Sequence, residues 1–214
     1  MNLQANVKAA RALSPADNRE FSPQKLGVSA PGWRRTEICG RLAEISAWGP
    51  SAALTMACDL ILEAQREGEP AAWIATGENS FFPPDVACYG IDLDALPVIR
   101  VSNGRCAARA ADKLLRSGAF GLVIIDLGRE RFVAPALQSR LLGLAGKHDS
   151  AVIFLTEKPA NFPSLGSLIS LRAQASKIKK GNGHFSCELQ IIKDKRRGPG
   201  WSHSNLRHGP AGLR

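Results

Sequence analysis

From residue 40 onward the chain alternates short apolar runs with amphipathic stretches, and this alternation limits what it can fold into. The strand-like runs lie at 42–46, 71–75, 98–101, 122–125 and 151–155, and the run at 122–125 is continuously apolar, as a central parallel strand would be. Between them, helical apolar periodicity is found at 51–67, 105–117 and 134–147. Strands that alternate with helices predict an α/β fold, with a mostly parallel sheet covered by helices on both faces.

The two ends of the chain do not follow this pattern. Residues 1–38 predict either a short amphipathic helix and a linker or a frayed tail, because Ser-Pro pairs interrupt the helical spacing. After residue 155, strand-like runs at 168–171 and 186–192 without a helix between them predict a β-hairpin at the sheet edge. Residues 196–214 are rich in Gly, Pro, His and Arg. We therefore expect three parts: 1–38, a core at 39–195, and a basic flexible tail at 196–214.

Composition restricts the partners and the compartment. The net charge of +9 favours acidic partners, nucleic acid first among them, over a merely basic surface. The five cysteines never form a Cys-x-x-Cys pair, and Cys58 and Cys106 fall on apolar helix faces, so buried free thiols in a reducing cytoplasm are expected. The cysteines and histidines show no metal-ligand spacing, and no run is long and apolar enough to span a membrane.

Six segments resemble, in order, the core of the RecA family. They are 40–45 (Gly-Arg-Leu-Ala-Glu-Ile), 62–65 (Leu-Glu-Ala-Gln), 90–96 (Gly-Ile-Asp-Leu-Asp-Ala-Leu), 114–126 (Leu-Leu-Arg-Ser-Gly-Ala, then Val-Ile-Ile-Asp), 137–142 (Leu-Gln-Ser-Arg-Leu-Leu) and 191–195 (Ile-Ile-Lys-Asp-Lys). The resemblance implies a RecA-like three-layer core. It also implies that a nucleotide-binding loop follows the strand at 42–46 and that Asp126 occupies the position of the Walker B carboxylate.

The expected nucleotide-binding loop departs from its pattern, GxxxxGK[ST]. In that pattern, backbone N–H groups cradle the phosphates and the lysine neutralises their charge. The corresponding remnant consists of Gly49, Pro50, Ser51, Ala52, Ala53 and Thr55. Alanines stand at the second glycine and at the lysine, so we expect no bound nucleotide cofactor and no enzymatic activity. We interpret Asp126 as a structural residue in preference to a metal ligand. Glu78 could stand for a catalytic glutamate only with a one-residue insertion.

The segments that match RecA's DNA-binding loops are also short, at 128–135 and 157–166, and Thr156-Glu157 replaces the Asn-Gln pair that senses nucleotide. A short RecA-like chain with a degraded loop and a basic end is similar to the ImuA family of SOS mutagenesis cassettes. That resemblance implies an adaptor in translesion synthesis. Its partners would be an ImuB-type polymerase homologue and an error-prone DNA polymerase, with contact to RecA or to DNA also allowed.

Two basic clusters are candidate contacts for a DNA backbone or an acidic protein surface. The first precedes a Gly-Asn-Gly turn and the second follows the last core strand; the cationic residues are Lys177, Lys179, Lys180, Lys193, Lys195, Arg196 and Arg197. The alternative interpretation is that these charges only keep the hairpin turn and the tail soluble. Trp201 in the tail is the better candidate for an interface tryptophan, whereas Trp48 is expected to pack on its own helix.

Three functions are therefore compared. The first is the non-catalytic RecA-like adaptor, which would use the N-terminal helix and the basic C-terminal segment. The second is a weak ATPase that holds Mg²⁺ with Thr55 and Asp126. The third is a cell-division inhibitor of the SulA type, another RecA-like family without a P-loop. The basic C-terminal segment favours the first.

Overall fold

A computed structural model describes residues 32–77, 81, 86 and 90–208. The expected helix at the start of the chain and Glu78 lie outside these residues. The elements are α1 Arg35–Ile38, β1 Arg41–Ala47, α2 Ala53–Arg66, β2 Ala71–Thr76, β3 Val98–Val101, α4 Gly104–Arg116, β4 Leu122–Gly128, α5 Pro135–His148, β5 Ala151–Glu157, β6 Ile169–Gly181, β7 His184–Asp194 and β8 Ser202–His208. The fold is thus the α/β fold that the alternation predicts.

The strands form one sheet in the order β3-β2-β4-β5-β1-β6-β7-β8. The first six strands pair in parallel, and β6–β7 and β7–β8 pair antiparallel. Strand β5 lies between β1 and β4. The turn after β1 and the carboxylate near the end of β4 therefore share the carboxyl edge of the sheet with one strand between them.

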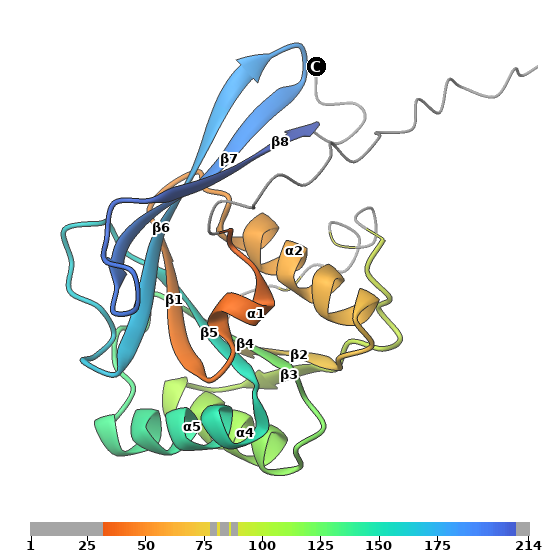
Figure 1. The fold of residues 1–214 in the computed structure, drawn as a ribbon, viewed down its shortest axis with the longest axis vertical. Helices are drawn as coiled ribbons and strands as arrows, with labels where there is room; N and C mark the ends of the chain where they lie inside the picture. Colours follow the sequence, from red (N-terminus) through yellow and green to blue (C-terminus); the bar gives the residue numbers. More distant parts are fainter. Residues whose placement is uncertain (1–31, 78–80, 82–85, 87–89, 209–214) are drawn as a thin grey trace, which may run out of the picture. The chain divides into compact units, whose positions relative to one another are not determined.

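Helices cover both faces of the parallel part, which Figure 1 shows with α2 on one side and α4 and α5 on the other. The sheet has a hydrophobic core on each face, and side chains of the strands point alternately into the two cores. Ile45 and Ile124 pack on the α2 side, whereas Leu42 and Ile125 pack on the α4–α5 side. Every residue of β1 is buried, as a strand covered on both faces requires.

Local signals set the helix ends close to the expected positions. Asn103 caps α4, its side chain accepting a hydrogen bond from the Cys106 backbone N–H (3.0 Å). Pro135 starts α5, and Asp149 in the left-handed conformation ends it. Cys58 is buried in α2, and burial raises the pKa of its thiol to about 12, whereas Cys106 is half-buried.

The C-terminal segment differs from the expected flexible tail. Residues 202–208 form β8, which pairs with β7 from His184↔His208 to Gln190↔Ser202. Trp201 is not a free interface residue either, because it packs against the core and its Nε1–H donates to Asp194 Oδ2 (3.3 Å). The pattern missed β8 because its residues are polar; its stability comes from the open edge of β7 and not from apolar burial.

The boundaries of the compact unit also differ from the expected ones. The unit begins at Gly32, so α1 and the described residues 196–208 belong to the core unit. Trp33 is buried and α1 packs against α2 and β5, which places residues assigned to a linker inside the fold. No helix among the described residues has the length and hydrophobicity to cross a membrane.

Candidate functional site

The β1–α2 turn, residues 48–52, holds most of the expected nucleotide-loop remnant. Gly49 adopts a left-handed φ of +71°, and α2 begins at Ala53. Ser51 Oγ accepts a hydrogen bond from the Ala53 backbone N–H (3.3 Å), so a side chain of the turn already occupies a helix N-terminal donor. An anion approaching this helix end would have to displace that contact.

The alanines that replace glycine and lysine are packed inward. Ala52 is fully buried and Ala53 is 8% exposed, whereas Thr55 is half-buried on the first turn of α2. Residues 47–56 contain neither Lys nor Arg. The turn therefore offers a phosphate no side-chain charge of its own, which is the feature a phosphate loop most needs.

Asp126 lies near the carboxyl end of β4, opposite Leu155 of β5 and Ala75 of β2. Its side chain is nearly buried, and burial raises its pKa to about 6, although a hydrogen bond from the Gly128 backbone N–H (3.2 Å) opposes the shift. Among the described residues, no group of three or more His, Cys, Asp or Glu side chains is placed to hold a metal ion.

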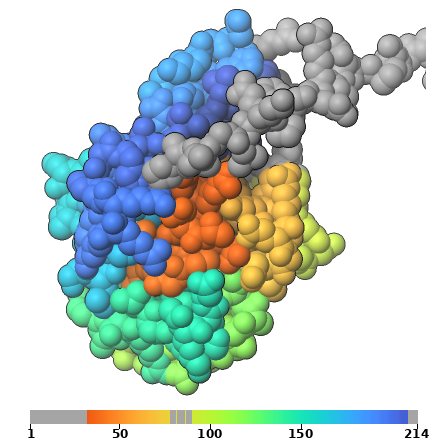
Figure 2. Space-filling model, viewed as in Figure 1, coloured from red at the N-terminus to blue at the C-terminus, as the bar shows by residue number. Residues whose placement is uncertain are grey.

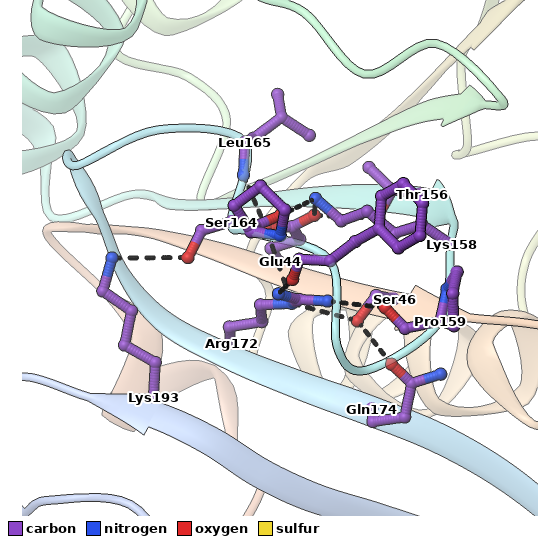
Figure 3. A network of polar contacts seen from close by, with 12 residues as sticks. Glu44, Ser46, Thr156, Lys158, Pro159, Ser164, Leu165, Arg172, Gln174 and Lys193 are labelled. Carbon is purple, nitrogen blue, oxygen red and sulfur yellow. Dashed lines mark hydrogen bonds and ion pairs between the residues drawn. The ribbon is translucent and has the colours of Figure 1, made fainter.

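A buried ionic network at the same edge was not anticipated from the sequence (Figure 3). Glu44 in the middle of β1 is fully buried, and its Oε1 lies 2.5 Å from Lys158 Nζ and accepts a hydrogen bond from Thr156 Oγ1 (2.8 Å). The Arg172 Nε lies 4.0 Å from Glu44 Oε2 and donates to Ser46 Oγ (3.2 Å). An acidic residue flanked by apolar residues within a strand was the available signal, because a buried carboxylate needs a cation.

This network contacts residues within 157–166, the segment expected to match the second DNA-binding loop. Lys158 Nζ donates to Pro163 O (2.7 Å), Glu44 Oε2 accepts from the Leu165 backbone N–H (3.0 Å), and Arg172 donates to Pro159 O (3.2 Å) and to Phe162 O. Burial lowers the pKa of Lys158 even with Glu44 in contact. Side-chain hydrogen bonds from the core therefore attach the backbone of this segment at several points.

The Thr156-Glu157 pair that replaces the nucleotide-sensing residues is also engaged within the protein. Thr156 binds Glu44, as described, and Glu157 Oε2 pairs with Arg129 Nε at 3.0 Å. Arg131 stacks over the Phe162 ring at 4.5 Å from its centroid. The two shortened loops thus contact each other at the carboxyl edge.

Exposed apolar side chains occupy this edge. Trp48 is 59% exposed and Leu54 is 54% exposed, so Trp48 does not pack on its own helix as expected. Phe132, in the loop before α5, is 70% exposed. Large exposed apolar side chains near one edge of a sheet are candidates for contact with a protein partner.

The two basic clusters are not brought together. Lys177, Lys179 and Lys180 lie near the β6–β7 turn. The cluster around Lys193 lies at the other end of the hairpin, where Lys193 of β7 is opposite Arg172 of β6 in the strand register. Members of the second cluster are largely engaged: Lys195 Nζ donates to Ser167 O (2.7 Å), Arg196 to Cys39 O (3.4 Å), and Arg197 pairs with Glu37 (2.7 Å). Their contacts hold the fold together.

A separate groove of about 800 Å³ lies between α4, α5 and β3, away from the carboxyl-edge turn. Its lining combines apolar residues such as Ile99, Leu114 and Leu137 with Arg109 and Arg140. Arg140 Nε lies 2.5 Å from Asp112 Oδ1, which also forms part of the lining.

The strand order, with β5 between the strand that leads into the turn and the strand that carries Asp126, defines a RecA-like α/β core. In agreement, the family model described as the RecA N-terminal domain matches residues 32–136. Protein RecA of Picosynechococcus sp. is 33% identical over 55% of this chain and 39% of its own length. Protein RecA of Chlorobium limicola is 38% identical over 41% of this chain and 25% of its own, and that of Corynebacterium urealyticum is 40% identical over 41% and 23%.

These comparisons support membership of the RecA-like superfamily. The chain spans well under half the length of the curated relatives it matches. The matched region includes the β1–α2 turn and β4, so the changes in the turn fall inside the part that is most similar to RecA.

Proposed function

We propose that this chain is a non-catalytic RecA-like adaptor in DNA repair, acting in SOS-induced translesion synthesis. The observation that carries the proposal is the β1–α2 turn, where two buried alanines replace the glycine and the lysine of a phosphate loop. A phosphate loop works through backbone donors and a lysine charge, and this turn keeps neither the charge nor an unoccupied first donor.

Energetics favour loss of catalysis over weak catalysis. Removing a single transition-state donor typically costs about 3–4 kcal/mol, or roughly two to three orders of magnitude in rate. Here the lysine charge, the flexible glycine and the adjoining hydroxyl are changed together, since Leu54 stands where the first Mg²⁺ ligand is expected. Several such losses in one loop remove most of the acceleration that a nucleotidase needs.

The partners that the ImuA resemblance implies are an ImuB-type polymerase homologue, an error-prone DNA polymerase and RecA. The exposed Trp48 and Leu54 suit such a role, because apolar contact area has replaced charge where RecA-like enzymes hold nucleotide. The segment 157–166 supports the same view, since its backbone is bound by side chains of the buried ionic network.

Calorimetry with a magnesium complex of a non-hydrolysable ATP analogue tests the first half of the proposal. We expect no binding heat at analogue concentrations of up to about 1 mM, where a functional site would saturate. Binding that requires Mg²⁺ and disappears in Asp126→Asn would favour the weak ATPase. Thr55 and Asp126 both remain at the expected positions for that activity, which is why it stays the second candidate.

Capture experiments with the three named partners test the second half. Cutting the chain after Ile192 would remove β8 as well as the basic residues, so point variants are the better probes. We expect Trp48→Ser with Leu54→Ser to abolish capture of at least one partner. The matched control is Ile178→Ser with Leu206→Ser, which removes two exposed apolar side chains from a different surface. Equal loss in both double variants, or none in either, would refute the carboxyl-edge interface.

A further inference from the structure

The β6–β7 hairpin extends well beyond the sheet from which it starts. Ser46 pairs with Gln174, and β1 ends one residue later at Ala47, whereas β6 continues to Gly181. At about 3.3 Å per residue, β6 projects about 20 Å past the end of β1. In Figures 1 and 2 this part of the hairpin, in light blue, stands clear of the body of the core unit.

Strand β8 contributes to this projection. The pairing places Lys179, Phe185 and Arg207 in one row across the three strands. The next row joins Gly181, His184 and His208, and the two imidazole rings lie 4.9 Å apart, edge to face. We call residues 176–187 with 204–208 the basic finger. Residues of the supposed tail thus complete the surface that carries the first lysine cluster.

The charged side chains within the basic finger are all positive. Neither of its two segments contains Asp or Glu, although Glu188 lies opposite Ser176 and Ser204 at the base of the finger. Lys177, Lys179 and Lys180 are all exposed. Within the described residues, no carboxylate pairs with these three lysines. Arg207 is different, because it forms an ion pair with Asp59 of α2 and so anchors β8 to the body. The positive charges of all three lysines are therefore available to an external anion, although Lys177 also lies over the Phe185 ring.

The contacts favour phosphate over stacked bases or an apolar protein surface. Lys177 Nζ lies 4.2 Å from the centroid of Phe185, the only aromatic residue of the finger apart from its histidines, and covers that ring. With one face of its ring covered, Phe185 is a poorer base-stacking platform than the open aromatic rings that single-strand binders use. Lysine is also depleted in the cores of protein interfaces. Duplex DNA presents one phosphate charge per about 1.7 Å of its axis, so neighbouring lysines can each meet a phosphate.

We propose that the basic finger binds the phosphate backbone of duplex DNA without reading its sequence. The inference goes beyond the adaptor function and does not depend on it, since it uses neither the β1–α2 turn nor a protein partner. It would give an adaptor held by proteins at one edge a separate, weak attachment to the template.

Fluorescence anisotropy with the full chain and a labelled duplex of about 25 base pairs, titrated between about 50 and 300 mM salt, tests the proposal. The test variant is Lys177→Gln, Lys179→Gln and Lys180→Gln together. The control, Arg66→Gln, Arg105→Gln and Lys147→Gln, removes the same charge from exposed positions on α2, α4 and α5. Both variants should keep the wild-type urea midpoint.

Each lysine that neutralises one phosphate adds about 0.9 to the slope of log affinity against log salt concentration. We expect the finger variant to reduce the slope by about 2.7 and to weaken binding by up to about 500-fold at 0.1 M salt. The control variant should retain most of the salt dependence and most of the affinity for the duplex. Equal losses in the control would overturn the proposal, as would tighter binding of a single strand than of the duplex. So would unchanged DNA binding combined with loss of an acidic protein partner, which would make the finger a protein-binding surface.

Discussion

Replacing Asp126 by Asn gives the sharpest test of how the carboxyl edge is built. Burial raises the pKa of this carboxyl from 3.8 to about 6 in the folded protein. The folded state therefore binds a proton more tightly than the unfolded state between these two values. By linkage, the contribution of Asp126 to the free energy of unfolding falls as pH rises through this window, and it stays low above pH 6.

The magnitude follows from the size of the shift. About two pKa units correspond to about 3 kcal/mol that the ionised carboxylate costs the folded protein at neutral pH. Asn keeps the oxygen that accepts the Gly128 N–H bond and carries no charge. We expect the stability of Asp126→Asn relative to wild type to increase by up to about 3 kcal/mol between pH 4 and pH 7.5.

Urea denaturation of both proteins at several pH values measures this difference directly. Asp194→Asn is the control of opposite sign. Burial opposes the ionisation of Asp194, but hydrogen bonds from the Arg196 backbone and from Arg41 lower its pKa overall. That variant should lose stability relative to wild type as pH rises. A difference for Asp126→Asn that is independent of pH, or that changes in the direction of the control, would refute the desolvation argument.

Two further predictions concern the packing of the loops and of β8. Lys158→Met should cost about 3 kcal/mol because it removes the close counter-ion of the buried Glu44 and leaves it with Arg172, whose Nε lies 4.0 Å from Glu44 Oε2. Adding Glu44→Gln should recover most of the loss in urea denaturation. Additive effects of the two changes would show that they are not coupled. Arg207→Ala should lower global stability by no more than about 1 kcal/mol, since the arginine is partly exposed. It should nevertheless speed amide exchange in 202–208, whereas Arg66→Ala should leave that exchange unchanged.

Sequence pattern was sufficient for the parallel core because its signals are local. Continuous apolar runs identify strands covered on both faces, and the Asn103 cap and Pro135 identify where helices begin. The degraded turn could also be located from the sequence, because loss of the lysine at Ala53 is a change of residue type. Its consequence for nucleotide binding remains a prediction.

Sequence pattern was insufficient wherever one segment is stabilised by another that is distant in the chain. Strand β8 has no apolar periodicity, and it forms because the edge of β7 and Asp59 of α2 supply its partners. Glu44 and Lys158 are 114 residues apart by number, and only the parallel pairing of β1 with β5 brings their charges together. The exposure of Trp48 was mispredicted for the same reason, since burial depends on neighbours from other strands.

The amino-acid sequence by itself determined the order of elements, the apolar layers and the absence of charge in the β1–α2 turn, because these depend on residue type and short-range spacing. Tertiary structure alone decided which cations remain exposed. Of the two basic clusters, the one near Lys193 is largely engaged by contacts within the fold, whereas Lys177, Lys179 and Lys180 project with β6 beyond the sheet. Which charged side chains form ion pairs depends on their positions in the tertiary fold, and these positions cannot be read from their spacing in the sequence.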